Sequence, residues 1–549
     1  MLVAAAVVGW QAGRPQPWRD EFATWSAVTR SPAALDRLTG HIDGVLEPYY
    51  RLLRAWIGVF GDSVVSLRGP SMLAAVATAG LVGVLGTVVG TRRAGLLAGL
   101  VYAVLPSTIR YGQEARPYAL AELAAVAATL LLFLALRRRR WFLWAGYAAA
   151  LAVLGALHLV MLLVLAGHLV AVLDDARTRR SWRSLLPPGA AVLAGVGVLV
   201  PLMLRGYPQT GVQLGSSHRT TLYLVAELPA GVCYGVVAAG ALLVLAVAGA
   251  LLSRRAGRVF GLMTLAPIAA LAGLALFVPV FNHRYVVFVA PLACVLAGLG
   301  LARWRLPLGP ALRRGPALPL GSGLRRGSGL PLGSGLRRGS GLWRGSGLRR
   351  GSGLRLGPAL RPGPALPLGP AVVVLLVLIT LPEQAAVRRS HERMSSPLID
   401  YRAAARVIST GRQPGDAIVY QRSGWQFADI AMEYYLRQDA PRDILAATSR
   451  TAAGSFWTPE VARPDAALAG VARVWAVVPD GSDHRPGQRY DRVRTVLVRA
   501  FRQAGRWRVS GLTILLYQRP PSADERRRVV DRLGAVRDRP GAVRDRSGR

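Results

Sequence analysis

The chain has 549 residues, of which 52% are hydrophobic, and a formal net charge of +39 at pH 7. Long apolar blocks alternate with short arginine clusters, a pattern typical of a polytopic helical membrane protein, because unpaired backbone cannot cross hydrocarbon. Membrane orientation and lipid headgroups explain the arginines, so we do not expect nucleic acid as a partner. Both cysteines, Cys233 and Cys294, lie in predicted spans, which excludes a disulfide framework in exported parts.

The first 62 residues combine a short apolar segment with a long loop. As a helix, residues 1–10 would cover about 15 Å, roughly half of the hydrocarbon thickness. No basic n-region or cleavage pattern marks a removable signal peptide, and a longer first helix stays open as an alternative. In the loop at 11–62, Ser31 and Pro32 predict the start of a short helix. Residues 49–60 predict an amphipathic helix, either at the membrane interface or packed on the loop.

Ten further apolar segments predict membrane spans, for a total of about eleven. They lie near 64–90, 94–106, 117–136, 141–157, 159–173, 185–204, 232–252, 259–280, 286–302 and 371–382. Arginine clusters stand at alternate ends of these segments, at 92–93, 137–140, 177–183, 254–258 and from 303 onward. Because positively charged loops stay in the cytoplasm, the alternation places the remaining loops outside. The outer groups would be the loop at 11–62, the turns at 110–118 and 283–285, His158 and the loop at 205–231.

Residues 1–302 form the predicted transmembrane core, and regions of different character follow it. Residues 303–370 repeat Ser-Gly-Leu-Arg-Arg-Gly and Gly-Pro-Ala-Leu units, which predict a disordered cytoplasmic insert before the last span at 371–382. Residues 383–520 predict a small outer α/β domain without a glycine-rich phosphate loop. The expected order is helix 400–410, strand 417–420, helix 427–437, strand 474–478, helix 491–503 and strand 513–517. The tail at 521–549 is predicted to be disordered.

Two adjacent carboxylates, Asp20 and Glu21, follow the first apolar segment. The helix dipole alone favours acidic residues at a helix start, so the pair by itself has a purely structural interpretation. The functional interpretation is that Asp20 is the base of a lipid-dependent sugar transfer. That interpretation requires other groups on the same face of the membrane.

Three more polar clusters share the predicted outer face: His41 to Asp43 with Tyr49 and Tyr50, the turn 110–118, and the turn 283–285. Polar clusters between short hydrophobic segments cost free energy near a membrane, which favours a functional role. The alternative is that the arginines of the turn at 110–118 anchor helix ends to phosphate headgroups. His158 is either a site residue or an interfacial side chain.

Several motifs occur in a fixed order. They are Trp-x-Asp-Glu from residue 18, His-x-Asp from 41, Pro-Tyr-Tyr from 48, Phe-Gly-Asp-Ser from 60, Leu-Arg-Gly-Pro-Ser from 67 and Arg-Tyr-Gly-Gln-Glu-Ala-Arg-Pro-Tyr-Ala-Leu from 110. The series resembles bacterial GT-C type glycosyltransferases, the family 39-like mannosyltransferases related to protein O-mannosyltransferases and the lipid A aminoarabinose transferase. The resemblance covers most of residues 15–300. It implies a GT-C type α-helical polytopic membrane protein with a small C-terminal extracytoplasmic α/β domain.

The resemblance also implies a polyprenyl-phosphate sugar donor, with mannose as the hexose, and inversion at the anomeric carbon. Asp20 would take the proton of the acceptor hydroxyl, and Glu21 is predicted beside it in the catalytic pair. A phosphate leaving group needs no strong general acid. The groups expected to bind donor phosphate or sugar are Arg110, Arg116, Arg284, Tyr111, Gln113, Glu114, Tyr118, His283 and Tyr285. The groups expected to bind acceptor or sugar are His41, Asp43, Tyr49 and Tyr50.

The favoured interpretation is a glycosyltransferase of the bacterial cell membrane, with its site outside. Its partners would be the polyprenyl-phosphate sugar, membrane lipids and an acceptor that is a protein, a lipid or a glycan. A divalent metal ion stays open, since no ligand spacing is diagnostic, and no other cofactor is predicted. The alternative is a transporter or flippase of a lipid-linked sugar, which would need neither the acidic pair nor the α/β domain. A non-catalytic membrane scaffold is the third option.

Overall fold

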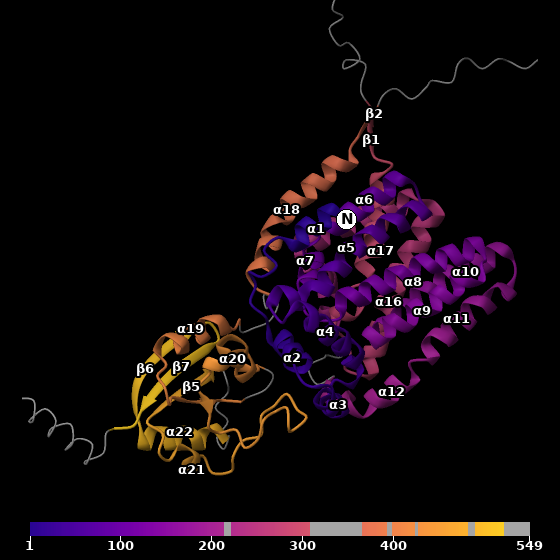
Figure 1. Ribbon diagram of the computed structural model, residues 1–549. Coiled ribbons are helices and arrows are strands. Elements are labelled where there is room, and N and C mark those ends of the chain that lie inside the picture. Colours follow the sequence, from indigo (N-terminus) through magenta and orange to yellow (C-terminus); the bar gives the residue numbers. More distant parts are fainter. Residues whose placement is uncertain (214–220, 308–364, 392–397, 423–425, 481–488, 521–549) are drawn as a thin grey trace, which may run out of the picture.

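The computed structural model describes residues 1–213, 221–307, 365–391, 398–422, 426–480 and 489–520. A helical body makes up the larger part, and a small sheet domain lies beside helix α2 at one end of it (Figure 1). The predicted disorder of 303–370 falls almost entirely outside the described residues, as does that of the tail at 521–549. The two ends of the insert, β1 (Arg305–Pro307) and β2 (Ala365–Pro367), pair as antiparallel strands.

Each of the eleven predicted apolar segments is helical. The helices are α1 (Leu2–Gly9), α5 (Val64–Val89), α6 (Arg92–Ala103), α7 (Pro106–Gly112), α8 (Tyr118–Arg138), α9 (Trp141–Leu157), α10 (Val164–Arg179), α11 (Leu186–Gly197), α12 (Val200–Gly206), α14 (Leu222–Cys233), α15 (Val236–Leu252), α16 (Arg254–Phe277), α17 (Val289–Leu301) and α18 (Gly369–Arg389). Short helices α13 (Thr210–Gln213), η2 (Leu159–Leu163), η3 (Trp182–Leu185), η4 (Tyr207–Gln209) and η5 (His283–Val286) connect some of them.

Fewer of these helices can cross a bilayer than the predicted eleven. Among the described residues, five are long and apolar enough, namely α5, α8, η2 with α10, α16 and α18. Three more candidate spans are pairs of helical segments joined at a bend. The bend is 64° between α6 and α7, 47° between the segments 182–197 and 200–209, which contain α11 and α12, and 92° between α14 and α15. The other three predicted spans, α1, α9 and α17, have 8, 17 and 13 residues, fewer than the roughly 20 that cross the hydrocarbon core.

Two predicted spans end at the wrong residue. The segment 94–106 breaks before Pro106, which starts α7, because proline disfavours a helical residue before it. The last span continues past its predicted end at 382, to Arg389. The polar residues that follow 382 in this helix include Glu383, which is buried. Its carboxylate accepts hydrogen bonds from the backbone N–H groups of Val237 and Ala238 at 2.9 and 3.0 Å. This carboxylate therefore caps the N-terminus of α15.

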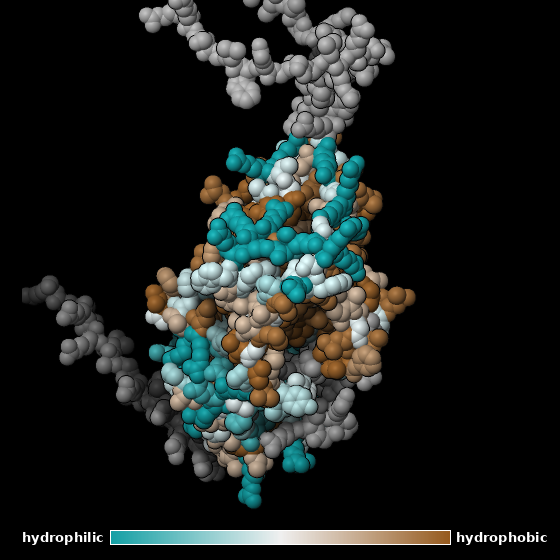
Figure 2. All heavy atoms as spheres, turned by 90° about the vertical axis from the view of Figure 1, so that its right-hand side faces the viewer, coloured by the Kyte–Doolittle hydropathy of each residue, from teal (hydrophilic) through white to brown (hydrophobic). Residues whose placement is uncertain are grey.

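The arginine clusters gather at one end of the helical body. Arg139, after α8, pairs with Asp175 of α10 at 3.2 Å. Arg255, at the start of α16, pairs with Asp174 of α10 at 2.7 Å, and Arg303, after α17, donates to Ser253 Oγ at 2.7 Å. Figure 2 shows hydrophilic side chains gathered at the upper end of the body, with hydrophobic side chains in the belt below.

Three helices form a layer at the other end of the body: α2 (Arg19–Val28), α3 (Pro32–His41) and α4 (Glu47–Phe60), with the short η1 (Gly44–Leu46) between the last two. The predicted start of α3 is confirmed, and residues 49–60 are helical as predicted. The Ser31 side chain accepts from Ala34 N at 3.3 Å and caps α3. Helix α4 buries Tyr49, Tyr50 and Leu53, and exposes apolar side chains such as Phe60.

The C-terminal domain is a five-stranded sheet in the order β4-β3-β5-β7-β6. Its elements are α19 (Tyr401–Gly411), β3 (Ala417–Tyr420), α20 (Ala428–Leu436), η7 (Arg437–Asp439), β4 (Arg442–Asp443), α21 (Pro464–Leu468), β5 (Arg473–Pro479), α22 (Arg489–Ala500), β6 (Arg502–Val509) and β7 (Leu512–Gln518). Strand β3 runs parallel to β4 and β5, and β7 is antiparallel to β5 and β6. The predicted α/β domain is confirmed, whereas β4 and β6 were not predicted. Both faces of β6 are largely exposed, so its sequence lacks the regular alternation of apolar and polar residues that predicts a half-buried strand.

Helices α15 and α17 approach each other at glycines. A Cβ placed on Gly249 would overlap the carbonyl oxygen of Leu296, and one on Gly300 would lie 2.9 Å from the Cα of Gly249. Small residues allow such close backbone approach between membrane helices. Gly240 belongs to α15 like Gly249, but a Cβ placed on it would meet nothing within 4 Å.

We therefore expect Gly249→Ala to destabilise the protein by about 1–3 kcal/mol, the usual effect of overpacking. Gly240→Ala is the matched control and should be neutral or slightly stabilising, since alanine has the higher helix propensity. Thermal unfolding of both variants in the same detergent measures the difference. Equal melting temperatures would show that the two helices are not in close contact.

Candidate active site

The acidic pair stands in the first turn of α2. Trp18 is the residue before the helix, and its backbone N–H donates to Glu21 Oε2 at 3.3 Å. Adjacent residues point about 100° apart around a helix axis. Accordingly, the side chain of Asp20 is 24% exposed, whereas that of Glu21 is 2% exposed. The two carboxylates therefore face different surroundings.

Asp20 meets a cation from a distant part of the sequence. Arg284, 264 residues away in η5, places Nη1 3.4 Å from Asp20 Oδ2. The guanidinium carbon of Arg284 lies 4.6 Å from the centroid of the Trp18 ring and 6.0 Å from that of Tyr118. Burial opposes the charge of Arg284, but Tyr118 and Asp20 outweigh it and raise its pKa above the ordinary value. A carboxylate and a permanent cation thus share one small region.

A second cation, Arg116, lies in the same region. Its Nη1 donates to Thr24 Oγ1 at 3.5 Å, on the same side of α2 as Asp20. Burial opposes the charge of Arg116, yet Asp20 and Asp43 are among the groups that raise its pKa. Asp43 in turn accepts from Tyr50 Oη at 2.7 Å, and burial raises its pKa. Five of the predicted residues therefore lie around Asp20, namely Arg284, Tyr118, Arg116, Asp43 and Tyr50.

An aromatic cluster adjoins these charges. The ring of His158 lies 5.5 Å from that of Tyr118 and 5.2 Å from that of Tyr285, measured between centroids. Burial, helped by the charge of Arg116, lowers the pKa of His158 to about 4. Its buried Nδ1 has no hydrogen-bond partner among the described residues. His158 is therefore a neutral polar group beside the two arginines.

Glu21 is held by a buried ion pair. Arg68 of α5 donates from Nε to Glu21 Oε1 and from Nη2 to Oε2, both at 2.8 Å. The backbone N–H of Ala115 also donates to Oε1, at 2.9 Å. Burial alone would raise the pKa of Glu21, but Arg68 reverses this and holds it well below the usual range. The carboxylate is charged and fully engaged by the protein, so its geometry suits positioning better than catalysis.

Arg68 has further partners. It donates to the carbonyl oxygens of Ala12 and Pro15 at 2.7 and 3.0 Å, and lies 3.4 Å from Nδ1 of His391, just past α18. Burial lowers the pKa of His391 to about 3, and its ring is therefore neutral at pH 7. One guanidinium thus ties the first loop, α2 and the segment after α18 together.

The remaining predicted residues lie at different distances from Asp20. Arg110 and Glu114 form a buried ion pair at 2.8 Å, with Arg110 behind the Trp18 ring. Gln113 donates to the carbonyl oxygens of Val8 and Trp10 and so holds the end of α1. His41 is exposed, with Nδ1 3.3 Å from the carbonyl oxygen of Gly454 in the C-terminal domain.

Three aromatic or imidazole groups complete the predicted set. Tyr111 is buried, with its ring 5.7 Å from that of Tyr118. Tyr49 is buried beside Tyr50, at 6.0 Å between ring centroids. His283 lies against α14, where a Cβ on Gly231 would come within 2.7 Å of its ring. These side chains pack around the site and do not contact Asp20.

Sequence reasoning missed three residues that hold the site together: Trp18, Arg68 and His391. Arg68 had a detectable signal, since an arginine near the start of an apolar segment is expensive unless it is paired. Trp18 lies beside the acidic pair, but nothing in the sequence indicates that two arginines pack on its ring, at 5.0 and 4.6 Å. His391 lies 370 positions from Glu21 in the sequence and carries no motif.

No group of three or more His, Cys, Asp or Glu side chains in the described residues is arranged to hold a metal ion.

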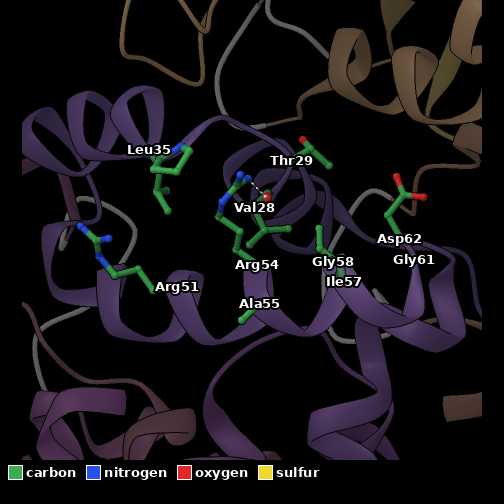
Figure 3. Close-up of a pocket in the computed structure, with 11 residues that line it drawn as sticks. Val28, Thr29, Leu35, Arg51, Arg54, Ala55, Ile57, Gly58, Gly61 and Asp62 are labelled. Carbon is green, nitrogen blue, oxygen red and sulfur yellow. Dashed lines mark hydrogen bonds between the residues drawn. The ribbon is translucent and has the colours of Figure 1, made fainter.

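A separate hollow of about 600 Å³ lies between α2, α3 and α4 (Figure 3). Apolar side chains line it together with Arg51, Arg54 and Asp62, and Arg54 Nη1 donates to Val28 O at 3.2 Å. None of its lining residues belongs to the predicted site.

Comparison with known proteins decides the fold. Residues 49–204 match the family model described as dolichyl-phosphate-mannose-protein mannosyltransferase. The crystal structure of ArnT from Cupriavidus metallidurans in the apo state matches 94% of this chain and 96% of its own, at 14% identity and a TM-score of 0.57. The chain has a GT-C type fold. The fold class and the resemblance predicted from the ordered motifs are thereby confirmed.

Other comparisons are more distant. The crystal structure of ArnT from the same organism bound to undecaprenyl phosphate matches 85% of this chain and 87% of its own. The identity is 15% and the TM-score is 0.52. An oligosaccharyltransferase from Archaeoglobus fulgidus matches at 13% identity, 86% and 67% coverage and a TM-score of 0.40. No curated protein matches the sequence.

The ion pair of Glu21 predicts a stability effect. Glu21→Gln should destabilise the protein by about 3–5 kcal/mol, because it leaves the buried charge of Arg68 without its partner. Asp36→Asn removes the partner of Arg51 in a pair that is about half exposed, at 51% and 52%, and should cost less than 1 kcal/mol. Thermal unfolding in detergent compares the two. A loss no larger than that of Asp36→Asn would mean that Glu21 is not buried against Arg68.

Burial of His391 predicts a dependence on acid. Its folded-state pKa of about 3 lies below the ordinary 6.5, so its stabilising contribution is complete above pH 6.5 and is lost as the pH falls toward 3. The pKa of the facing Glu21 is held well below this range, so its carboxylate does not titrate between pH 7.5 and 5. For this group alone we expect a loss of up to about 2 kcal/mol at pH 5.

The measurement is the melting temperature between pH 7.5 and 5. His391→Asn should flatten the decrease, while His41→Asn, on an exposed side chain, should leave it unchanged. An unaltered slope in the His391 variant would contradict the assignment.

Proposed function

We propose that this protein is a membrane glycosyltransferase that moves a hexose, with mannose as the expected sugar, from a polyprenyl-phosphate donor to an extracytoplasmic acceptor. The observation that carries the proposal is the contact of Asp20 with Arg284, with Arg116 in the same region. A proton acceptor can activate the acceptor hydroxyl, and the two cations can stabilise the departing phosphate in an inverting transfer. The GT-C type fold supports the same activity.

The chemistry follows from these charges. The carboxylate of Asp20 takes the proton of the acceptor hydroxyl while that oxygen bonds to the anomeric carbon. The bond from the anomeric carbon to the phosphate oxygen breaks on the opposite face, and its electron pair stays on the phosphate. Arg284 and Arg116 stabilise the growing negative charge by charge-assisted hydrogen bonds. One carboxylate is sufficient, so Glu21 is assigned a positioning role through Arg68.

The cations are expected to exchange partners during the reaction. In the described structure Arg284 faces Asp20 at 3.4 Å, a longer distance than the usual 2.7–2.9 Å of a charge-assisted hydrogen bond. The donor phosphate would take over part of this guanidinium and leave Asp20 free to accept a proton. His158 and the rings of Tyr118 and Tyr285 would contact the sugar, since aromatic faces and a neutral imidazole suit a polyhydroxylated ring.

Orientation supports an outer site. The arginine clusters after α8 and α17 and before α16 share one end of the body through their contacts. Asp20, Arg116 and Arg284 belong to the opposite ends of the helices. If the positive end is cytoplasmic, the site and the C-terminal domain face outward from the cell membrane. ArnT, which shares the fold, has a crystal structure with bound undecaprenyl phosphate. That complex supports a polyprenyl-phosphate carrier for the donor of this protein.

Asp20→Asn tests the proposal. The variant should lose about 10²- to 10⁴-fold in turnover, because the amide cannot accept the proton, while donor binding changes little. Membranes carrying the wild type or the variant would be incubated with radiolabelled polyprenyl phosphomannose, and labelled acceptors identified. Asp36→Asn, on an exposed α3 side chain, is the control and should keep full activity. Full transfer by the Asp20 variant would refute the assignment of the base, and absence of transfer by the wild type from any polyprenyl-phosphate sugar would refute the function.

A further inference from the structure

The C-terminal domain packs directly on the helix that carries Asp20. Phe22 of α2 is fully buried, and its ring centroid lies 5.1 Å from that of Tyr401, 5.7 Å from that of Tyr434 and 6.0 Å from that of Tyr435. All three tyrosines belong to the C-terminal domain, on α19 and α20. Edge-to-face ring pairs of this kind fix an orientation as well as burying area. We call these three tyrosines the tyrosine socket.

A second aromatic residue of α2 joins the same surface. The ring of Trp25 lies 5.3 Å from that of Tyr434, and its Nε1 donates to Asp62 at 2.8 Å. Arg437 lies 5.1 Å from the Trp25 ring and pairs with the same carboxylate at 2.7 Å. The side chains of the C-terminal domain therefore hold α2 and the start of α5 together.

The two faces of α2 are opposite in role. Asp20 and Thr24, four residues apart, share one face, which meets Arg284 and Arg116. Phe22 lies about 200° around the helix axis from Asp20, and it faces the socket. Any rotation or shift of α2 in the socket moves Asp20 relative to the two arginines. Since α2 has only ten residues, its own backbone cannot fix that position.

Further contacts extend the attachment along the layer that α2 begins. Arg30, after α2, donates to the carbonyl oxygen of Ser455 at 2.6 Å. Before α2, the side-chain oxygen of Gln16 accepts from the backbone N–H of Arg402 at 3.2 Å. His391, between α18 and the domain, touches the Glu21–Arg68 pair. The domain thus holds both ends of α2 as well as its middle.

From this arrangement we infer that the C-terminal domain is a structural part of the catalytic centre, and that Phe22 and Tyr434 are positioning residues for Asp20. The effect on turnover rests on the proposed function, whereas the effect on α2 does not. Misplacement of a catalytic group by about 1 Å costs roughly 100-fold in rate. Loosening the socket should therefore lower kcat without removing a substrate contact.

The test uses the full chain in detergent or nanodiscs. Phe22→Ala and Tyr434→Ala should each lower kcat by about 10- to 100-fold, with the donor KM changed less than about threefold. The double variant should lose little more than either single one, because both changes empty the same socket. Tyr434→Phe keeps the ring, so its kcat should stay close to that of the wild type, unlike that of Tyr434→Ala. Trp507→Ala, which removes a ring whose centroid lies 5.5 Å from that of Trp475 in the same domain, is the matched control and should leave kcat unchanged.

Hydrogen exchange of the α2 backbone, measured without substrate, separates the two proposals. Exchange in residues 19–28 should be faster in Phe22→Ala and Tyr434→Ala than in the wild type and Trp507→Ala. Arg437→Gln, a change on a half-exposed side chain, tests the surface without risk to the core and should lower kcat by about two- to fivefold. Unchanged exchange in α2 would overturn the positioning role. Faster exchange in a protein that transfers no sugar would retain that role and refute the proposed function.

Discussion

The arrangement of the site depends on one buried ion pair, that of Glu21 with Arg68. Taking two charges out of water is expensive, and the cost is recovered only if nearly every donor and acceptor finds a partner. Here the pair has two parallel hydrogen bonds at 2.8 Å, the N–H of Ala115 and the carbonyl oxygens of the first loop. The pair therefore fixes the start of α2 against α5 and against the turn before α8.

This constraint explains why two neighbouring carboxylates have different properties. Glu21 points into the protein, where its charge is compensated and its pKa is lowered. Asp20, one residue earlier, points to the region shared by Arg284 and Arg116 and stays partly exposed. The Glu21–Arg68 pair thus gives Asp20, the proposed base, a defined position while the oxygens of Asp20 stay partly accessible. The tyrosine socket supports the same helix from the other face.

The location of the charges also follows from membrane physics. Charged side chains are costly in hydrocarbon, so the polar groups gather at helix ends, where several short segments meet. The bends between α6 and α7 and between α14 and α15 allow this, because each interrupts an apolar helix near polar residues. Arg110 and Glu114 occur beside the first of these bends, as a neutralised pair behind Trp18. In the proposed reaction, we expect this end of the bundle to hold the charged phosphate of the donor next to its apolar lipid chain.

The sequence alone determined a large part of this picture. Hydropathy located the apolar helices, the arginine clusters located one end of the bundle, and alternating strands and helices identified the C-terminal α/β domain. The ordered motifs around Asp20 and Arg110 indicated the GT-C type. These features could be predicted because each depends on local composition or spacing, which bilayer thickness and backbone hydrogen bonding translate directly into structure.

Only the tertiary structure decided which polar groups meet. Sequence proximity suggested that Asp20 and Glu21 act together, yet their side chains point about 100° apart around the helix axis and meet different partners. The topology predicted Arg284 on the same face as Asp20, but not their direct contact. Nothing in the sequence indicated that His391 would touch Glu21, or that Phe22 would enter a socket of the C-terminal domain. Such contacts join residues hundreds of positions apart, and they are set by how the helices pack, which no local pattern encodes.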